Sequence, residues 1–290
     1  MKTRIISGIV MGIIVAAVLA LGFLWNPIII TLCVALIAAG AVYELLHNVA
    51  GIKCKAAWIG GCVYTFLTVF ALNYKSGNGD VLILPLGLTS PIWSSWRPGI
   101  YGRDLPVILA VLYGVFAVIM ILKNHKDFDL AKIVSLFALP LPYAFAYFCL
   151  SGVINWDNGI YYLLLLLNFS SVCDMGAYFV GVTCGKHKLC PNISPKKTVE
   201  GAIGGIVSSM VVTVILGLCF SKSLVIPMIL TIPFCILGMI GDLFASAIKR
   251  SVGIKDYSNL IPGHGGILDR TDSIIMIAPL LYLFITLGVI

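Results

Sequence analysis

Apolar runs long enough to cross a bilayer recur from one end of this sequence to the other, and they constrain its fold more than any other feature. The chain of 290 residues is 60% hydrophobic and 11% charged, which leaves too little polar surface for a soluble domain of that size. A helix of about 20 apolar residues spans the hydrocarbon core of a membrane. The sequence therefore predicts an all-α polytopic membrane protein.

We expect about nine transmembrane helices. The first apolar run follows Lys2 and Arg4, as in a signal peptide, but it is long enough to span and further spans follow it. The predicted spans are Ile5–Leu24, Ile28–Leu46, Ala56–Tyr74, Leu105–Leu122, Leu130–Leu150, Gly159–Val182, Gly201–Phe220, Leu224–Gly241 and Ser273–Ile290. Pro140 and Pro142 predict a kink in the fifth span.

The stretch 81–93 is apolar but too short to be a tenth span. Pro85, Gly87 and Pro91 interrupt it, and a helix of this length reaches only ~20 Å, against a hydrocarbon core of ~30 Å. We therefore expect a re-entrant or interfacial segment here. Five spans and this segment make up a predicted N-terminal membrane region, residues 1–150. The remaining spans make up a C-terminal region, residues 151–290.

Lysines and arginines are distributed unevenly between the two sides that nine spans define. Of the 19 in the chain, Lys75, Arg97, Arg103 and Lys222 fall on one side, and the other 15 fall on the opposite side. Cytoplasmic loops of membrane proteins carry the excess of positive charge. The N-terminus and both large polar loops are therefore predicted to face the cytoplasm. The net charge of +7 reflects this placement, and we expect no nucleic-acid partner.

Two titratable residues, Glu44 and His47, close the second predicted span. A functional role is one alternative. Glutamate is rarely buried unless it is paired, however, and polar side chains gather where a membrane helix meets water. We therefore expect both residues at a solvated helix end.

The stretch Ser246–Asp272 concentrates charge in an otherwise apolar chain, and it reads SAIKRSVGIKDYSNLIPGHGGILDRTD. Three glycines surround His264, so the backbone there can turn tightly and approach a ligand closely. Carboxylates suited to a hard cation lie beside lysines and arginines suited to phosphate. A polar loop between membrane helices is the simpler explanation, but it does not account for this order of residues.

A second polar cluster lies around the sixth span. Asp174 falls inside that span, where an acid is costly and marks a functional site or a buried pair. The loop Thr183–Val199 follows, and the sequence SPKKTVEG, residues 194–201, lies at its end. The adjacent residues Lys196 and Lys197 are either orientation signals or contacts for phosphate.

The charged stretch resembles the signature of the phosphatidate cytidylyltransferases (CDP-diacylglycerol synthases). That signature runs Ser-x-apolar-Lys-Arg, four residues, Lys-Asp, and then Pro-x-His-Gly-Gly-apolar-x-Asp-Arg-x-Asp, and every fixed position is filled between Ser246 and Asp272. The residues around Asp174 and SPKKTVEG are similar to the other block that this family shares. One departure is Val182, where the family usually has arginine or lysine. The first 150 residues match only in hydropathy and in a Tyr-Glu pair that ends at Glu44.

The resemblance implies that the chain condenses CTP with phosphatidate, giving CDP-diacylglycerol and pyrophosphate. The residues expected to act on phosphates are Lys197, Lys249, Arg250, His264 and Arg270. Those expected to bind substrate are Asp174, Ser194, Pro195, Lys196, Thr198, Lys255, Gly265 and Gly266. Those expected to orient the bases are Glu200, Asp256 and Asp272.

Asp242 and Asp269 are the expected ligands of Mg²⁺, which bridges nucleotide phosphates in such enzymes. The resemblance also suggests a second cation at this site. Asp242 follows the eighth span, and Ser246 and Lys249 follow Asp242 at helical spacing, so one helix face carries all three. The glycine loop would then bring Asp269 back towards Asp242.

Two alternatives stay open. A related enzyme would activate another lipid phosphate, such as an ether-linked or isoprenoid lipid. A transporter is the alternative from another class, although transporters often carry inverted repeats with broken helices, and we find none in this sequence.

For an enzyme we expect an integral membrane protein, in the plasma or inner membrane if prokaryotic, with its active site facing the cytoplasm. Its expected partners are CTP, phosphatidate or a related lipid acid, and membrane lipids. A homodimer is one alternative for its oligomeric state.

Overall fold

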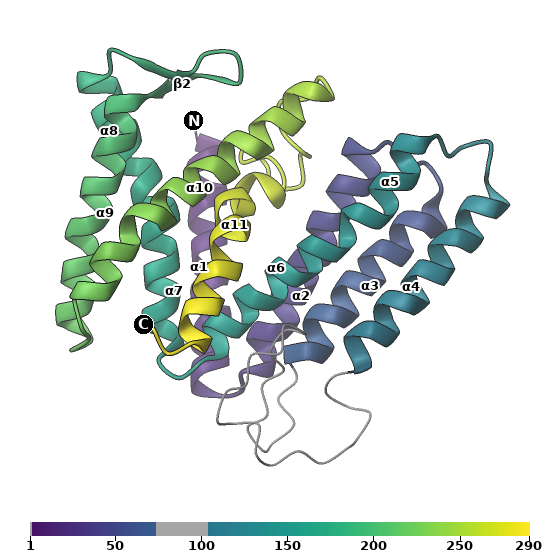
Figure 1. Ribbon diagram of the computed structural model, residues 1–290, viewed down its shortest axis with the longest axis horizontal. Coiled ribbons are helices and arrows are strands. Elements are labelled where there is room, and N and C mark those ends of the chain that lie inside the picture. Colours follow the sequence, from purple (N-terminus) through teal and green to yellow (C-terminus); the bar gives the residue numbers. More distant parts are fainter. Residues whose placement is uncertain (1, 74–103) are drawn as a thin grey trace. The chain divides into compact units, whose positions relative to one another are not determined.

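The computed structural model describes residues 2–73 and 104–290, with side chains described for residues 7–71 and 107–290. Helices dominate the described residues, and one short two-stranded hairpin accompanies them (Figure 1). The chain packs into two compact units. Unit 1 comprises Met1–Gly152 and Ser258–Ile267, and unit 2 comprises Val153–Tyr257 and Leu268–Ile290. The short stretch 258–267, which lies within the predicted C-terminal region 151–290, therefore packs with the N-terminal helices in unit 1.

Within the described residues, six helical stretches are long and apolar enough to cross a membrane. They are Ser7–Leu24, Ile28–Val49, Leu130–Asn155, Gly159–Cys184, Val199–Cys219 and Val225–Ser251. Two shorter apolar helices, Lys55–Ala71 and Val107–Lys123, coincide with two further predicted spans. This agrees with an all-α polytopic membrane protein. The predicted segment 81–93 lies outside the described residues, and the count of nine spans stays a prediction.

Unit 1 is a bundle of helices from the first half of the chain. Its elements are α1 (Lys2–Leu24), α2 (Ile28–Tyr43), the π-helix η1 (Glu44–Val49), α3 (Lys55–Asn73), α4 (Asp104–Lys123), α5 (Leu130–Ala138) and most of α6 (Pro140–Asn155). Helix α3 packs against both α2 and α4 (Figure 1). The predicted kink is confirmed as a break, because α5 ends at Ala138 and α6 begins at Pro140. Proline suits that first helical position, since it has no N–H to pair there.

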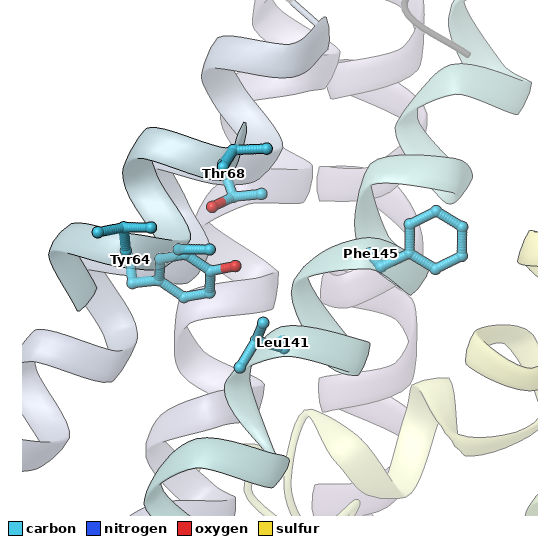
Figure 2. Close-up of a pocket in the computed structure, with 7 residues that line it drawn as sticks. Tyr64, Thr68, Leu141 and Phe145 are labelled. Atoms are coloured by element: carbon cyan, nitrogen blue, oxygen red, sulfur yellow. The ribbon is translucent and has the colours of Figure 1, made fainter. Parts of the chain in front are cut away.

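An apolar pocket of about 470 Å³ lies between α3, α4 and α6 of unit 1. Figure 2 shows Tyr64 and Thr68 of α3 on one side of it, and Leu141 and Phe145 of α6 on the other. Its described lining contains no charged side chain. The pocket therefore does not suit a nucleotide.

Unit 2 contains the polar cluster around the sixth predicted span and the lysines, arginines and aspartates of the stretch Ser246–Asp272. Its elements are α7 (Gly159–Leu167), the π-helix η3 (Asn168–Val172), α8 (Cys173–Cys184), β1 (Lys188–Cys190), β2 (Ser194–Thr198), α9 (Val199–Cys219), α10 (Val225–Ser251) and α11 (Leu268–Thr286). The Asn168 side chain donates hydrogen bonds to the Ser209 carbonyl (3.0 Å) and to Thr213 Oγ1 (2.9 Å). Thr213 in turn bonds Thr231 (2.9 Å), so buried polar side chains tie η3, α9 and α10 together.

Helices α8 and α9 approach each other closely because small residues line their contact. A Cβ atom at Gly201 would lie 2.6 Å from the Ala177 carbonyl oxygen, and one at Gly205 would lie 2.5 Å from the Cys173 carbonyl oxygen. Glycines at such positions let the backbones of membrane helices meet. The tight contact holds Asp174, in the first turn of α8, near the start of α9.

Helix α10 extends beyond the eighth predicted span. That span ends at Gly241, and the helix continues to Ser251 with Asp242 and Lys249 on its polar end, as the helical spacing of Asp242, Ser246 and Lys249 predicts. Gly241 packs against the start of α11, since a Cβ atom there would lie 2.9 Å from the Asp272 carbonyl oxygen. The helix extension therefore brings the charged residues of α10 beside those of α11.

Candidate active site

The predicted loop after the sixth span folds in part as a hairpin, in which β1 pairs antiparallel with β2. Thr198 caps α9, because its Oγ1 accepts a hydrogen bond from the Gly201 N–H (3.1 Å). Glu200 accepts hydrogen bonds from the backbone N–H groups of Lys186 (3.0 Å) and His187 (3.1 Å). Thr198 and Glu200 thus fix the hairpin onto α9 and position Lys197, the residue before Thr198.

Lys197 forms an ion pair with Asp242 of α10, with 2.5 Å between Nζ and Oδ2. The two side chains are 24% and 29% exposed. Lys197 Nζ is itself buried and makes no hydrogen bond of standard geometry within the described residues. Asp174 interacts electrostatically with both partners. The structure therefore gathers one lysine and two acids from α8, β2 and α10.

Lys249 and Asp269 form a second ion pair, with 2.6 Å between Nζ and Oδ1. It is more buried than the first, because the Lys249 side chain is 12% exposed and that of Asp269 is 4% exposed. Tyr257 completes the arrangement. Its backbone N–H donates to Asp269 Oδ2 (2.8 Å), and its ring lies 5.1 Å from Lys249 Nζ.

Sequence reasoning missed the role of Tyr257. Its hydroxyl donates to the Ala245 carbonyl (3.1 Å), and the residue is 2% exposed. It thereby anchors the chain that leaves α10 while presenting its N–H to Asp269. The available signal was an aromatic residue directly after the Lys-Asp pair of the signature.

Asp272 interacts electrostatically with Asp242, which the sequence did not predict. It precedes the apolar segment Ser273–Ile290, and burial, followed by the negative charge of Asp242, raises the pKa of Asp272 to about 6. The sequence predicts that Asp272 orients a base and that the glycine loop brings Asp269 back towards Asp242. In the structure Asp269 pairs with Lys249, and Asp272 interacts electrostatically with both Asp242 and Lys249.

The remaining predicted residues of unit 2 are less buried. Ser194 is half-buried in β2. Arg250 donates a long hydrogen bond to the Ile254 carbonyl (3.4 Å). The exposed members of the set are Pro195, Lys196, Arg250, Lys255, Asp256 and Arg270.

The histidine and glycines of the signature lie in unit 1. Pro262 and Gly263 occupy the centre of a turn that the His264 N–H closes on the Ile261 carbonyl (2.9 Å). Gly263 and Gly265 adopt φ of 78° and 83°, which side-chain-bearing residues rarely adopt. The His264 ring is held by the Ser7 hydroxyl of α1, with 2.8 Å between Nδ1 and Oγ.

The expectation for Glu44 was wrong. Its side chain is 0% exposed, whereas His47 is exposed as expected. The Glu44 carboxylate accepts hydrogen bonds from Ser258 and Ile267, which lie more than 200 residues away in the sequence and within the same unit. Hydrogen bonds from a hydroxyl and a backbone N–H explain why a carboxylate is tolerated in this buried position.

Comparison with known proteins assigns this chain to a family. The profile of the cytidylyltransferase family matches residues 2–287. The chain belongs to this family. Membership favours an enzyme over the transporter alternative and covers the first 150 residues as well as the two polar blocks.

Two relatives match nearly the whole chain, and a third matches part of it. The chain is 32% identical to the phosphatidate cytidylyltransferase of Bacillus subtilis over 293 residues, covering 99% of this chain and 98% of the relative. It is 29% identical to the phosphatidate cytidylyltransferase of Haemophilus influenzae, with 96% of each chain covered. The enzyme of the same name from Staphylococcus haemolyticus is 35% identical over 180 residues, or 61% of this chain and 68% of the relative.

Proposed function

We propose that this protein transfers CMP from CTP to phosphatidate, giving CDP-diacylglycerol and pyrophosphate for phospholipid synthesis. The similarity to phosphatidate cytidylyltransferases along nearly the whole chain carries this proposal. The two lysine–aspartate pairs of unit 2 supply the charges that the reaction needs. The protein is thus a nucleotidyltransferase embedded in a membrane.

The chemistry asks for positioning and charge neutralisation. A phosphate oxygen of the lipid attacks the α-phosphorus of CTP, and the bond to the bridging oxygen of the β-phosphate breaks. Pyrophosphate leaves with that electron pair. The attacking oxygen is already anionic, so no strong general base is required, as in other phosphoryl transfers. Fixed cations at the phosphates lower the barrier by stabilising the charge of the transition state.

Lys197 and Lys249 are the cations best placed for this work. Each forms an ion pair with an aspartate, so both are positioned before substrate binds. Lys197 Nζ has an ion pair but no standard hydrogen bond within the described residues, so it retains N–H donors for a phosphate. Arg250 and Arg270 are exposed and can reach outward to phosphates as bidentate donors.

The carboxylates of unit 2 suit Mg²⁺. No group of three or more histidine, cysteine or acidic side chains in the described part of the chain forms a self-sufficient metal site. Mg²⁺ needs only one or two protein carboxylates when nucleotide phosphates and water supply its other oxygens. Asp242 and Asp269 would hold it, with Asp272 as a neighbour of Asp242. The bound ion would neutralise phosphate charge, and a second cation stays part of this proposal.

We place the active site on the cytoplasmic side of the membrane. The distribution of 15 lysines and arginines against four supports this orientation. The lipid tails then enter sideways from the bilayer, and the phosphate headgroup stays at the polar rim where CTP arrives.

The test is an assay of the purified protein with CTP, Mg²⁺ and a set of lipid acids in mixed micelles. We expect CDP-lipid formation with phosphatidate at a higher kcat/KM than with ether-linked or isoprenoid phosphates. A clear preference for an ether-linked or isoprenoid phosphate would identify that lipid as the substrate in place of phosphatidate. No CDP-lipid from any of them would overturn the proposed function.

A further inference from the structure

A fully buried acid lies in the N-terminal helices, far in sequence from both polar blocks. Glu44 is 0% exposed and begins η1, where the α-helical hydrogen bonding of α2 changes to the wider π pattern. Burying a carboxylate is costly unless other groups hydrogen-bond to it. The groups that hydrogen-bond to Glu44 therefore indicate its structural role.

Ser258 and Ile267, which hydrogen-bond to Glu44, belong to the signature loop, which we define as residues 258–267. Glu44 Oε1 accepts a hydrogen bond from the Ser258 hydroxyl (2.6 Å) and another from the Ile267 N–H (2.8 Å). Ser258 and Ile267 are the first and last residues of the stretch that packs into unit 1. A single carboxylate oxygen thus ties the two ends of the loop together.

Steric fit supports the same contact. A Cβ atom at Gly266 would lie 2.5 Å from Oε2 and 2.6 Å from Oε1 of Glu44. Gly266 therefore has no room for a side chain while Glu44 is in place. Gly263 and Gly265 are needed for their positive φ instead, so the three glycines of the loop serve two different physical purposes.

We propose that Glu44 is a positioning residue that closes the signature loop at its base and fixes the conformation of His264, Gly265 and Gly266. The role rests on the proposed function and on the expectation, implied by the family resemblance, that these three loop residues act on or bind the phosphates of the substrates. Glu44 itself is fully buried and acts through the loop.

The first test measures loop order without any substrate. Hydrogen–deuterium exchange of the purified full chain reports on peptides that cover residues 258–267. We expect Glu44→Ala to raise exchange at the Ile267 amide about 10-fold or more, because the amide loses a charge-assisted hydrogen bond. Ser258→Ala, which removes one of the two bonds, should have a smaller effect. His47→Ala is the matched control, since His47 is exposed on the same π-helix.

The second test measures kcat and KM for CDP-lipid formation. We expect Glu44→Ala to lower kcat/KM about 10²-fold, the loss that follows when a preorganised contact is misplaced. Glu44→Gln should recover most of that loss, because one amide oxygen can accept both hydrogen bonds that Oε1 accepts now. Rescue by glutamine distinguishes positioning through hydrogen bonds from a general need for a negative charge.

A double-mutant cycle tests the contact itself. Gly266→Ala should lower kcat/KM strongly in the natural background and much less in the Glu44→Ala background, where the carboxylate no longer occupies the space. Independent, multiplicative effects would overturn the proposal, as would unchanged exchange of residues 258–267 in Glu44→Ala. If the natural protein makes no CDP-lipid, the proposed function fails, and the exchange measurements still decide whether Glu44 closes the loop. If Glu44→Ala does not fold, Ser258→Ala and Gly266→Ala carry the same test.

Discussion

Replacing Asp269 with asparagine separates the structural from the catalytic role of the charged cluster in unit 2. Asp269 Oδ1 accepts from Lys249 Nζ (2.6 Å), and Oδ2 accepts from the Tyr257 N–H (2.8 Å). Its side chain is 4% exposed. Asparagine offers one acceptor oxygen and one NH₂ group at these two positions, so one of the two donors loses its partner.

The size of the effect follows from this geometry. An unpaired buried donor costs about 1–3 kcal/mol, and breaking a buried ion pair costs about 3–5 kcal/mol. Because the Lys249 side chain keeps 12% exposure, we expect the free energy of unfolding to fall by about 3 kcal/mol, near the lower end of that range. Turnover should fall by about 10²-fold or more, since a preorganised charge is lost from the site. We expect no recovery at any Mg²⁺ concentration.

Two measurements on the purified protein check this prediction. Unfolding in detergent reports stability, and CDP-lipid formation from CTP and phosphatidate reports turnover. The control is the double variant Asp269→Leu with Lys249→Met, which removes both charges and should recover much of the lost stability but none of the activity. Turnover of Asp269→Asn close to that of the natural protein would refute the catalytic role. Additive stability losses in the double variant would refute the coupling of the pair.

Three further predictions concern the other charges. Lys197→Ala should cripple turnover while leaving membrane insertion intact, whereas Lys196→Ala, which alters an exposed neighbour, should stay within a few-fold of normal activity. Near-normal activity in both variants would reduce this loop to an orientation signal. Asp242→Asn should raise the Mg²⁺ requirement of CDP-lipid formation, and an unchanged Mg²⁺ dependence would remove Asp242 from the metal site. Ser194→Cys, in a background without other cysteines, should be protected from an impermeant thiol reagent outside the cell, and labelling there would invert the predicted orientation.

Hydropathy predicts where the helices of this chain lie but not where they end. The spans predicted from Ile28 and from Leu130 begin where the observed helices begin, because a polar turn directly precedes each apolar run. Helix α10 runs past Gly241 to Ser251 because backbone hydrogen bonding continues after apolar residues stop. Lys249 and Arg250 of the signature are therefore helical, which hydropathy alone does not reveal.

The candidate site was predictable only where the residues are close in sequence or matched a family pattern. The two polar blocks of the sequence contain Lys197, Lys249 and Asp269, and Asp242 lies just before the second block. Which lysine pairs with which aspartate depends on how α8, α9, α10 and α11 pack, and the sequence does not predict it. Glu44 was missed because its partners are 214 and 223 residues away. The Tyr-Glu pair at the end of an apolar run was the one signal that pointed to it.

The most direct test of the central claim follows the phosphorus atoms of CTP through the reaction. Purified protein is incubated with phosphatidate and Mg²⁺, together with CTP labelled with ³²P at either the α or the γ position. Transfer of CMP predicts that α-label appears in the lipid and γ-label appears in pyrophosphate. Label from the γ position in the lipid, or no label in the lipid from the α position, would contradict the account.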